Sequence, residues 1–128
     1  SRAALPHLLK RGGGRIVNQS GGGGVAPARS YGITVVAGVG LTTALAKQWG
    51  KDGITCNAIA PGNVKSDAGK MLAPEDSPFL QYLKMSCPIH AQGEPEELVG
   101  TAIMLCSEAG KWITGQTINI DGGWVMRP

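Results

Sequence analysis

Three short apolar segments, separated by stretches with a helical pattern, constrain the fold of this chain more than any other feature. The first begins at Ile16-Val17, the second runs from Ile54 to Ala60 and ends at Pro61-Gly62, and the third runs from Thr117 to Ile120. Short segments rich in branched apolar residues and ended by Gly or Pro are typical of buried strands. Because strands joined through helices run parallel, the order predicts an α/β fold with a three-stranded parallel sheet.

Helices are predicted before, between and after these strands. Residues 1–9 are apolar at helical spacing, and acidic residues between Glu94 and Glu97 suit the first turn of a helix that continues to about Ser107. Residues 31–49 are ambiguous because Ile33-Thr-Val-Val36 favours a strand, but the length of the apolar pattern favours a helix. Residues 63–77 are predicted to form a mobile loop.

Composition excludes several classes of function. The chain has 128 residues, 42% of them hydrophobic, and a net charge of +3. It can therefore bury a core as one domain, while its dispersed Lys residues and few aromatic residues argue against nucleic-acid binding. No apolar run approaches the roughly 20 residues needed to span a bilayer, and no apolar leader opens the chain. We expect a cytoplasmic location and no membrane partner.

The cysteine and histidine residues predict neither a disulfide framework nor a metal site. Cys56, Cys87 and Cys106 are odd in number and lack CxxC spacing, which favours small buried thiols. His90 has no second His, Cys or Asp at ligand spacing and is interpreted as a loop residue.

Four consecutive glycines, Gly21 to Gly24, follow the first predicted strand. Backbone amides in such a run could cradle a phosphate. However, no Gly-Lys-Ser or Gly-Lys-Thr follows, and the spacing matches no nucleotide fingerprint, so a flexible loop is favoured.

The order of several motifs identifies a family. Arg15-Ile-Val-Asn-Gln-Ser20, Tyr31 with the Gly40-Leu-Thr-Thr-Ala-Leu-Ala46 segment, Asn57-Ala-Ile-Ala-Pro-Gly62 and Ile113-Thr-Gly-Gln-Thr-Ile-Asn-Ile-Asp-Gly-Gly123 follow one another along the chain. Together they resemble the C-terminal half of the short-chain dehydrogenase/reductase (SDR) family, and are similar to its 3-oxoacyl-carrier-protein reductases.

The resemblance implies a fold, a reaction and partners. Residues 1–128 would be a partial SDR domain, the C-terminal half of a doubly wound Rossmann-type sheet without the N-terminal dinucleotide-binding half. The family moves hydride between NAD or NADP and a small-molecule carbonyl or alcohol substrate, and a homo-oligomer is expected of the full-length protein.

The resemblance also implies catalytic positions, two of which are altered here. Tyr31 occupies the position of the family's catalytic Tyr, but Val35 stands four residues later where the family has a Lys that lowers the pKa of the Tyr. Gly21 stands at the catalytic Ser position, and Tyr31 follows it by only 10 positions, a shorter interval than is usual in the family. Ser20 could either replace the missing Ser or make a backbone hydrogen bond at the strand end.

A second element resembles the family's contact with the nicotinamide carboxamide. It consists of Pro61, Gly62, Val64 and Ser66, with Ser66 keeping the hydroxyl of the usual Thr. The resemblance also implies that Tyr31 contacts the cofactor and that the family's Lys, here Val35, holds the ribose. A Pro-Gly turn after a strand is also common in any α/β protein.

Two functions from different classes remain open. The chain could belong to an NAD(P)-dependent oxidoreductase whose catalysis is impaired. Alternatively, it is a non-catalytic SDR fragment that retains only subunit association, or has no function.

Overall fold

The computed structural model describes residues 1–22, 30–72 and 74–126, and these form a parallel three-stranded sheet. Its strands are β1 (Gly14–Gln19), β2 (Ile54–Pro61) and β3 (Thr117–Ile120), in the order β1-β2-β3. Ile16 is paired with Cys56, and Ile59 with Ile118. The predicted α/β class, with its parallel sheet, is confirmed.

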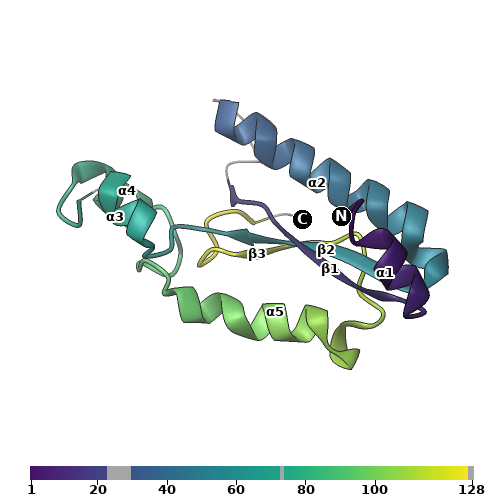
Figure 1. Cartoon of the computed structure of the whole chain (residues 1–128). Helices are drawn as coiled ribbons and strands as arrows, with labels where there is room; N and C mark the ends of the chain where they lie inside the picture. The colour runs from purple at the N-terminus through teal and green to yellow at the C-terminus, as the bar shows by residue number, and fades with distance from the viewer. Residues whose placement is uncertain (23–29, 73, 127–128) are drawn as a thin grey trace.

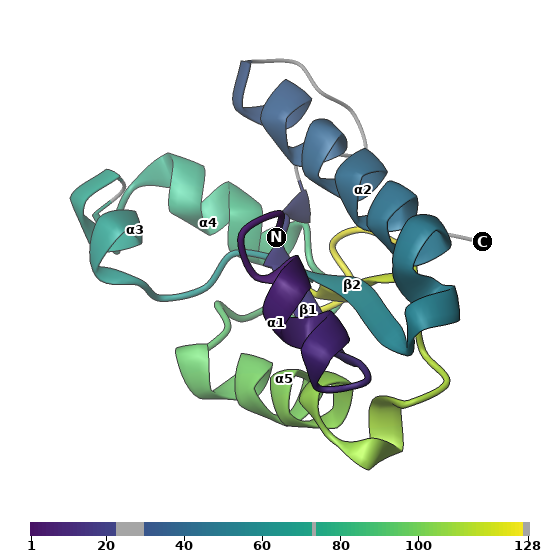
Figure 2. The same cartoon turned by 45° about the vertical axis from the view of Figure 1, so that its right-hand side comes forward.

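Helices cover both faces of this sheet. The helices are α1 (Leu5–Lys10), α2 (Ser30–Trp49), α3 (Asp67–Leu72), α4 (Pro78–Met85) and α5 (Val99–Cys106). Short 3-10 segments lie at Gly50–Asp52, Pro95–Leu98 and Glu108–Gly110. Helix α2 lies on one face of the sheet and α5 on the other, whereas α3 and α4 extend beyond the ends of the strands (Figures 1 and 2).

The ambiguous segment at 31–49 is helical, as its length predicted. Ser30–Trp49 forms the long helix α2, although Ile33, Thr34 and Val36 favour a strand when considered alone. Packing against β2 explains the outcome, since Leu45, Ala46 and Trp49 are buried together there. Tertiary packing therefore outweighs the local strand preference.

The helix predicted from Glu94 begins as a 3-10 turn over Pro95–Leu98 and becomes α-helical at Val99. A capping box holds this start, because the carboxylate of Glu97 accepts a hydrogen bond from the backbone N–H of Glu94 at 3.0 Å.

The predicted mobile loop at 63–77 is wrong in part. It contains α3 and a bridge in which Val64 pairs with Gly93, and it leads into α4, which was not predicted. The side chain of Ser77 caps α4 by accepting a hydrogen bond from Leu80 N at 3.2 Å. Helices of six and eight residues carry too few turns to show a clear periodicity.

The glycine run is described only in its first half. Gly21 and Gly22 follow β1 and are buried. Gly23 and Gly24 lie outside the described residues.

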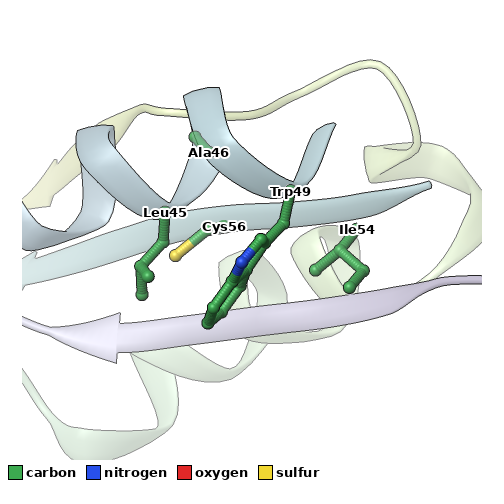
Figure 3. Close-up of a cluster of buried hydrophobic side chains, with 5 residues drawn as sticks. All are labelled: Leu45, Ala46, Trp49, Ile54 and Cys56. Carbon is green, nitrogen blue, oxygen red and sulfur yellow. The ribbon is translucent and has the colours of Figure 1, made fainter. Parts of the chain in front are cut away.

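The core lies between α2 and the strands (Figure 3). Leu45 and Trp49 point from α2 towards the sheet, where they meet Ile54 and Cys56 of β2. Leu5 and Leu8 of α1 pack against the same cluster from the side of β1. This cluster joins the two N-terminal helices and the two longer strands into one unit.

The thiols differ from the prediction at one position. Cys56 and Cys87 are buried, and burial raises the pKa of both thiols. Cys106 is exposed, because its neighbour Leu105 is the residue of α5 that turns fully inward. Adjacent helical residues point about 100° apart, so both cannot face the sheet.

No helix in the described part of the chain combines the length and the apolar character that crossing a membrane would require.

The core makes a first prediction. Leu45→Ala should lower the free energy of unfolding by about 2–5 kcal/mol, because it opens a cavity beneath α2. Leu41→Ala on the same helix is the matched control and should change it by less than about 0.5 kcal/mol, since Leu41 is 51% exposed and Leu45 only 8%. Urea unfolding followed by circular dichroism measures both. Equal losses would contradict the placement of α2.

Candidate functional site

The carboxyl ends of the three strands lie at one edge of the sheet, where ligands bind in open α/β folds. Ser20 and Gly21 follow β1, Gly62 follows β2 and Asp121 follows β3. Backbone hydrogen bonds join these ends: Ser20 N donates to Ile59 O at 2.7 Å, and Gly62 N donates to Ile120 O at 3.0 Å.

Gly21 and Tyr31 meet at this edge. A Cβ atom placed on Gly21 would lie 3.0 Å from the Tyr31 hydroxyl oxygen and 3.9 Å from Cγ2 of Val35. A hydroxyl-bearing side chain at position 21 would therefore stand beside the Tyr31 hydroxyl. The interpretation of Gly21 as the position of a catalytic Ser stays a prediction.

Gly21, Tyr31 and Val35 form one corner of this edge, and the side chain of Val35 makes the corner apolar. It is 6% exposed, whereas Tyr31 is 66% exposed and offers its ring and hydroxyl to solvent. Val35 lies one helical turn after Tyr31 on α2, as the sequence predicted, and brings no charge to it.

Ser20 lies beneath α2 rather than beside the open edge. The Asn18 side chain donates to Thr42 Oγ1 of α2 at 3.0 Å, and Ser20 follows by two positions, so it faces the same side of the sheet. Ser20 is buried, and its Oγ has no hydrogen-bond partner among the described residues. The alternative in which this hydroxyl bonds to backbone is therefore wrong for the part of the chain that the structure describes.

The segment after β2 is fixed by close packing. A Cβ on Gly62 would lie 2.5 Å from Cβ of Asp121 and 2.6 Å from its Cα, so glycine is required there by the backbone of the next strand end. The Pro61-Gly62 turn thus packs directly against Asp121, the first residue of the C-terminal tail that follows β3.

Val64 presents its backbone to one side. In its bridge with Gly93, Lys65 N donates to Gly93 O and Gly93 N donates to Asn63 O, both at 2.9 Å. Alternate residues of an extended segment point their N–H and C=O groups in opposite directions, so those of Val64 point away from Gly93. Ser66 lies two residues further on and is exposed.

An ion pair between Lys65 and Glu94 holds the segment that follows β2. The Lys65 ammonium contacts the Glu94 carboxylate, and this carboxylate raises the pKa of Lys65. Both side chains are partly exposed, so the pair adds little to stability and serves mainly to hold the Asn63–Ser66 segment near the start of α5.

Two further residues lie at this edge, Asp121 and Trp124, and the sequence did not predict that they would meet the residues that follow β2 and β1. The Asp121 carboxylate accepts hydrogen bonds from Gly123 N and Val125 N, each at 3.0 Å. Trp124 lies against Gly22, where a Cβ would be 2.9 Å from its Cζ3 atom. An Asp before two glycines is a turn signal, and it could have indicated that the tail folds back.

A hollow of about 240 Å³ opens beside the ends of β1 and β2. Its lining residues are Val17, Asn18, Gln19, Ile59, Pro61 and Leu98. It places apolar surface next to the Pro61-Gly62 turn. Among the described residues, no group of three or more His, Cys, Asp and Glu is placed to hold a metal ion.

Comparison with known proteins identifies the family of this chain. The family model described as enoyl-(acyl carrier protein) reductase matches residues 1–125. An uncharacterized oxidoreductase of Mycobacterium tuberculosis (strain H37Rv) is 39% identical over 127 residues, covering 99% of this chain and 50% of the relative. The 3-oxoacyl-[acyl-carrier-protein] reductase of Synechocystis is 38% identical over 130 residues, covering 98% of this chain and 50% of the relative.

A solved structure of a related dehydrogenase also matches this chain. The gluconate 5-dehydrogenase of Burkholderia cenocepacia, solved in complex with NADP and tartrate, has a TM-score of 0.87 and 31% identity, covering 96% of this chain and 49% of that chain. This chain belongs to the short-chain dehydrogenase/reductase family, and the predicted resemblance is confirmed. It spans about half the length of the curated relatives it matches.

The residues of this edge fit one part of a nicotinamide nucleotide and not another. A carboxamide carries one acceptor and two donors, which suits the outward-facing N–H and C=O of Val64. The ribose contact that the resemblance assigns to a Lys does not fit an apolar side chain such as that of Val35.

The close packing of Gly62 makes a second prediction. Gly62→Ala should lower the free energy of unfolding by about 1–3 kcal/mol, because the new methyl group overlaps the Asp121 backbone, which cannot move freely. Gly21→Ala is the matched control at the neighbouring strand end. It should cost less than about 1 kcal/mol, since the exposed Tyr31 side chain can shift away. Chemical unfolding of both variants tests this, and a larger loss for Gly21→Ala would contradict it.

Proposed function

We propose that residues 1–128 are the C-terminal half of the Rossmann domain of an NAD(P)-dependent SDR oxidoreductase, and that this half carries an impaired proton-transfer site. The observation that carries the proposal is the meeting of Tyr31, Gly21 and Val35 within one corner. The corner keeps the tyrosine of the family and lacks both the hydroxyl and the ammonium that accompany it.

In this proposal Tyr31 donates a hydrogen bond to the carbonyl oxygen of a small-molecule substrate. A tyrosine hydroxyl transfers its proton more readily at neutral pH when a nearby cation favours its ionised form. Val35 supplies no cation, so Tyr31 would orient the substrate more effectively than it would protonate it.

Ser20 is the hydroxyl nearest in sequence to the vacant Ser position. Its buried Oγ lacks a partner among the described residues, so a change that turned it towards Gly21 would gain a hydrogen bond. We propose Ser20 as the residual contributor to catalysis, secondary to Tyr31.

Pro61, Gly62, Val64 and Ser66, with Tyr31, would hold the nicotinamide end of NAD or NADP. Support comes from the direction of the Val64 backbone and from the hollow beside Pro61. When bound, the nucleotide would supply the hydride. The adenine and pyrophosphate contacts would belong to the N-terminal half of such a domain.

Subunit association is the second candidate function. Ile33, Val36 and Leu41 of α2 are exposed apolar side chains, and exposed apolar groups on one helix favour contact with another chain. A non-catalytic SDR chain that only associates, in the cytoplasm, would use this surface and need neither Gly21 nor Tyr31.

The partial fit to the nucleotide makes a third prediction. The 128-residue chain alone should not bind NADH or NADPH with micromolar affinity, because only the carboxamide element is present in it. Isothermal titration with each nucleotide measures this, with a full-length SDR reductase as the positive control. Micromolar binding would show that the nucleotide site does not need an N-terminal half.

The missing hydroxyl and ammonium make a fourth prediction. In a chimera that carries the N-terminal half of the Synechocystis 3-oxoacyl-[acyl-carrier-protein] reductase, Val35→Lys alone should leave carbonyl reduction near background. Combined with Gly21→Ser and a lengthened loop before Tyr31, it should raise kcat at least about 100-fold, the lower range for a restored general acid. Oxidation of NADPH gives the rate.

Tyr31→Phe in the repaired chimera is the control and should return the rate to background. Strong activity from Val35→Lys alone would mean that Gly21 does not occupy the catalytic Ser position. A repaired chimera without activity would favour the association function.

A further inference from the structure

A cavity of about 250 Å³ lies between the segment that follows β2, the start of α5 and the end of β3. Its described wall includes Asn63, Val64 and parts of the Cys87–Gly93 segment. Val64 is the one residue of this described wall that the proposed nicotinamide contact also uses, and its N–H and C=O groups point away from Gly93. The cavity therefore lies on the opposite side of the Val64 backbone from that contact.

Most of this wall is apolar. Val64, Ile89, Leu98 and Ile120 line it with aliphatic side chains, and Cys87 lines it with a thiol that is only 3% exposed. Burial raises the pKa of this thiol, so it stays neutral near pH 7 and acts as a small apolar group. The wall therefore favours a ligand with an apolar body.

The described residues leave one hydrogen-bond donor of the wall without a partner. Asn63 Oδ1 accepts a hydrogen bond from Gln92 Nε2 at 3.2 Å, which orients the amide. Asn63 Nδ2 is buried and has no partner among the described residues. A buried donor without an acceptor destabilises the protein, so a ligand that brings an acceptor oxygen binds better here than one without.

The described charged residues of the wall are all acidic. Glu94 and Glu97 bond to each other's backbone in the capping box, and both oxygens of the Asp121 carboxylate accept backbone N–H groups. These carboxylates already have partners, and their charge disfavours an anionic ligand. A neutral ligand is therefore favoured. Because Arg29 and Arg127 lie outside the described residues, an anionic probe belongs in the test.

The volume limits the size of the ligand. Since an apolar protein cavity of about 150 Å³ accepts benzene, a cavity of about 250 Å³ suits a molecule of about ten non-hydrogen atoms.

We propose that this cavity binds a small neutral molecule that has an apolar body and one acceptor oxygen, such as an ester. The body packs against the aliphatic side chains of the wall, and the oxygen accepts a hydrogen bond from Asn63 Nδ2. Neither Tyr31 nor a nucleotide takes part, so the site is independent of the proposed function.

The test uses the 128-residue chain and three probes of similar size. Methyl benzoate is the neutral ester, benzoate is its anionic counterpart, and ethylbenzene lacks the oxygen. Alkylation of the thiols by iodoacetamide, followed by mass spectrometry, reports on Cys87 in the cavity, Cys56 in the core and exposed Cys106. We expect methyl benzoate to slow alkylation of Cys87 in a saturable manner and more than that of Cys56, with Cys106 unchanged. Benzoate should change none of the three.

Variants assign the contacts, with binding measured by ligand-observed NMR titration. Asn63→Leu keeps the volume and removes the donor, so it should raise the Kd for methyl benzoate about threefold to tenfold and leave ethylbenzene no weaker. Cys87→Met should abolish binding of both, because the longer side chain fills the cavity. Cys106→Met is the matched control on an exposed thiol and should leave both Kd values unchanged.

Three outcomes would overturn the inference. The first is no saturable protection of Cys87, which would mean that the cavity holds only water. The second is binding of benzoate as tight as that of methyl benzoate. The third is an unchanged Kd for methyl benzoate in folded Asn63→Leu, a result that stays decisive if Cys87→Met does not fold. An inactive repaired chimera in the fourth prediction would leave this site unaffected.

Discussion

The parallel pairing of β2 with both neighbouring strands is the interaction on which the rest of the structure depends. Seven of the eight residues of β2 are buried, and its backbone is bonded to β1 on one side and to β3 on the other. Because all three strands run the same way, their carboxyl ends meet at one edge. Ser20, Gly62 and Asp121, which are far apart in sequence, are brought together by this pairing.

Much of the fold could be predicted, because its parts are long or regular. A continuous apolar run predicts a buried strand at β2, and the 20 residues of α2 outweigh a short strand-favouring stretch inside it. The helices α3 and α4 could not be predicted, since their six and eight residues are too short for a clear pattern. Cys106 was placed wrongly because composition does not give the direction in which a helical residue points.

The candidate site likewise has a part that the sequence predicts and a part that it does not. Tyr31, Gly21 and Val35 could be related from spacing and family resemblance, and their contact in space depends on the packing of α2 on the sheet. The approach of Trp124 to Gly22 could not be predicted, because it joins two positions about 100 residues apart in sequence. The turn signal at Asp121 predicts that the tail bends, but not where it goes.

The changes at Gly21 and Val35 are best understood together, since a Cβ on Gly21 would lie 3.9 Å from the Val35 side chain. A Lys at this buried position would need hydrogen-bond partners for its ammonium, and without them its burial would cost several kcal/mol. A valine removes that requirement and packs as an ordinary core residue of α2. An apolar residue at position 35 is therefore favourable for stability. Under the proposed function, it also leaves Tyr31 without the cation that would favour its ionised form. If the proposed function holds, stability and catalysis place opposite demands on this corner, and the residues present satisfy stability.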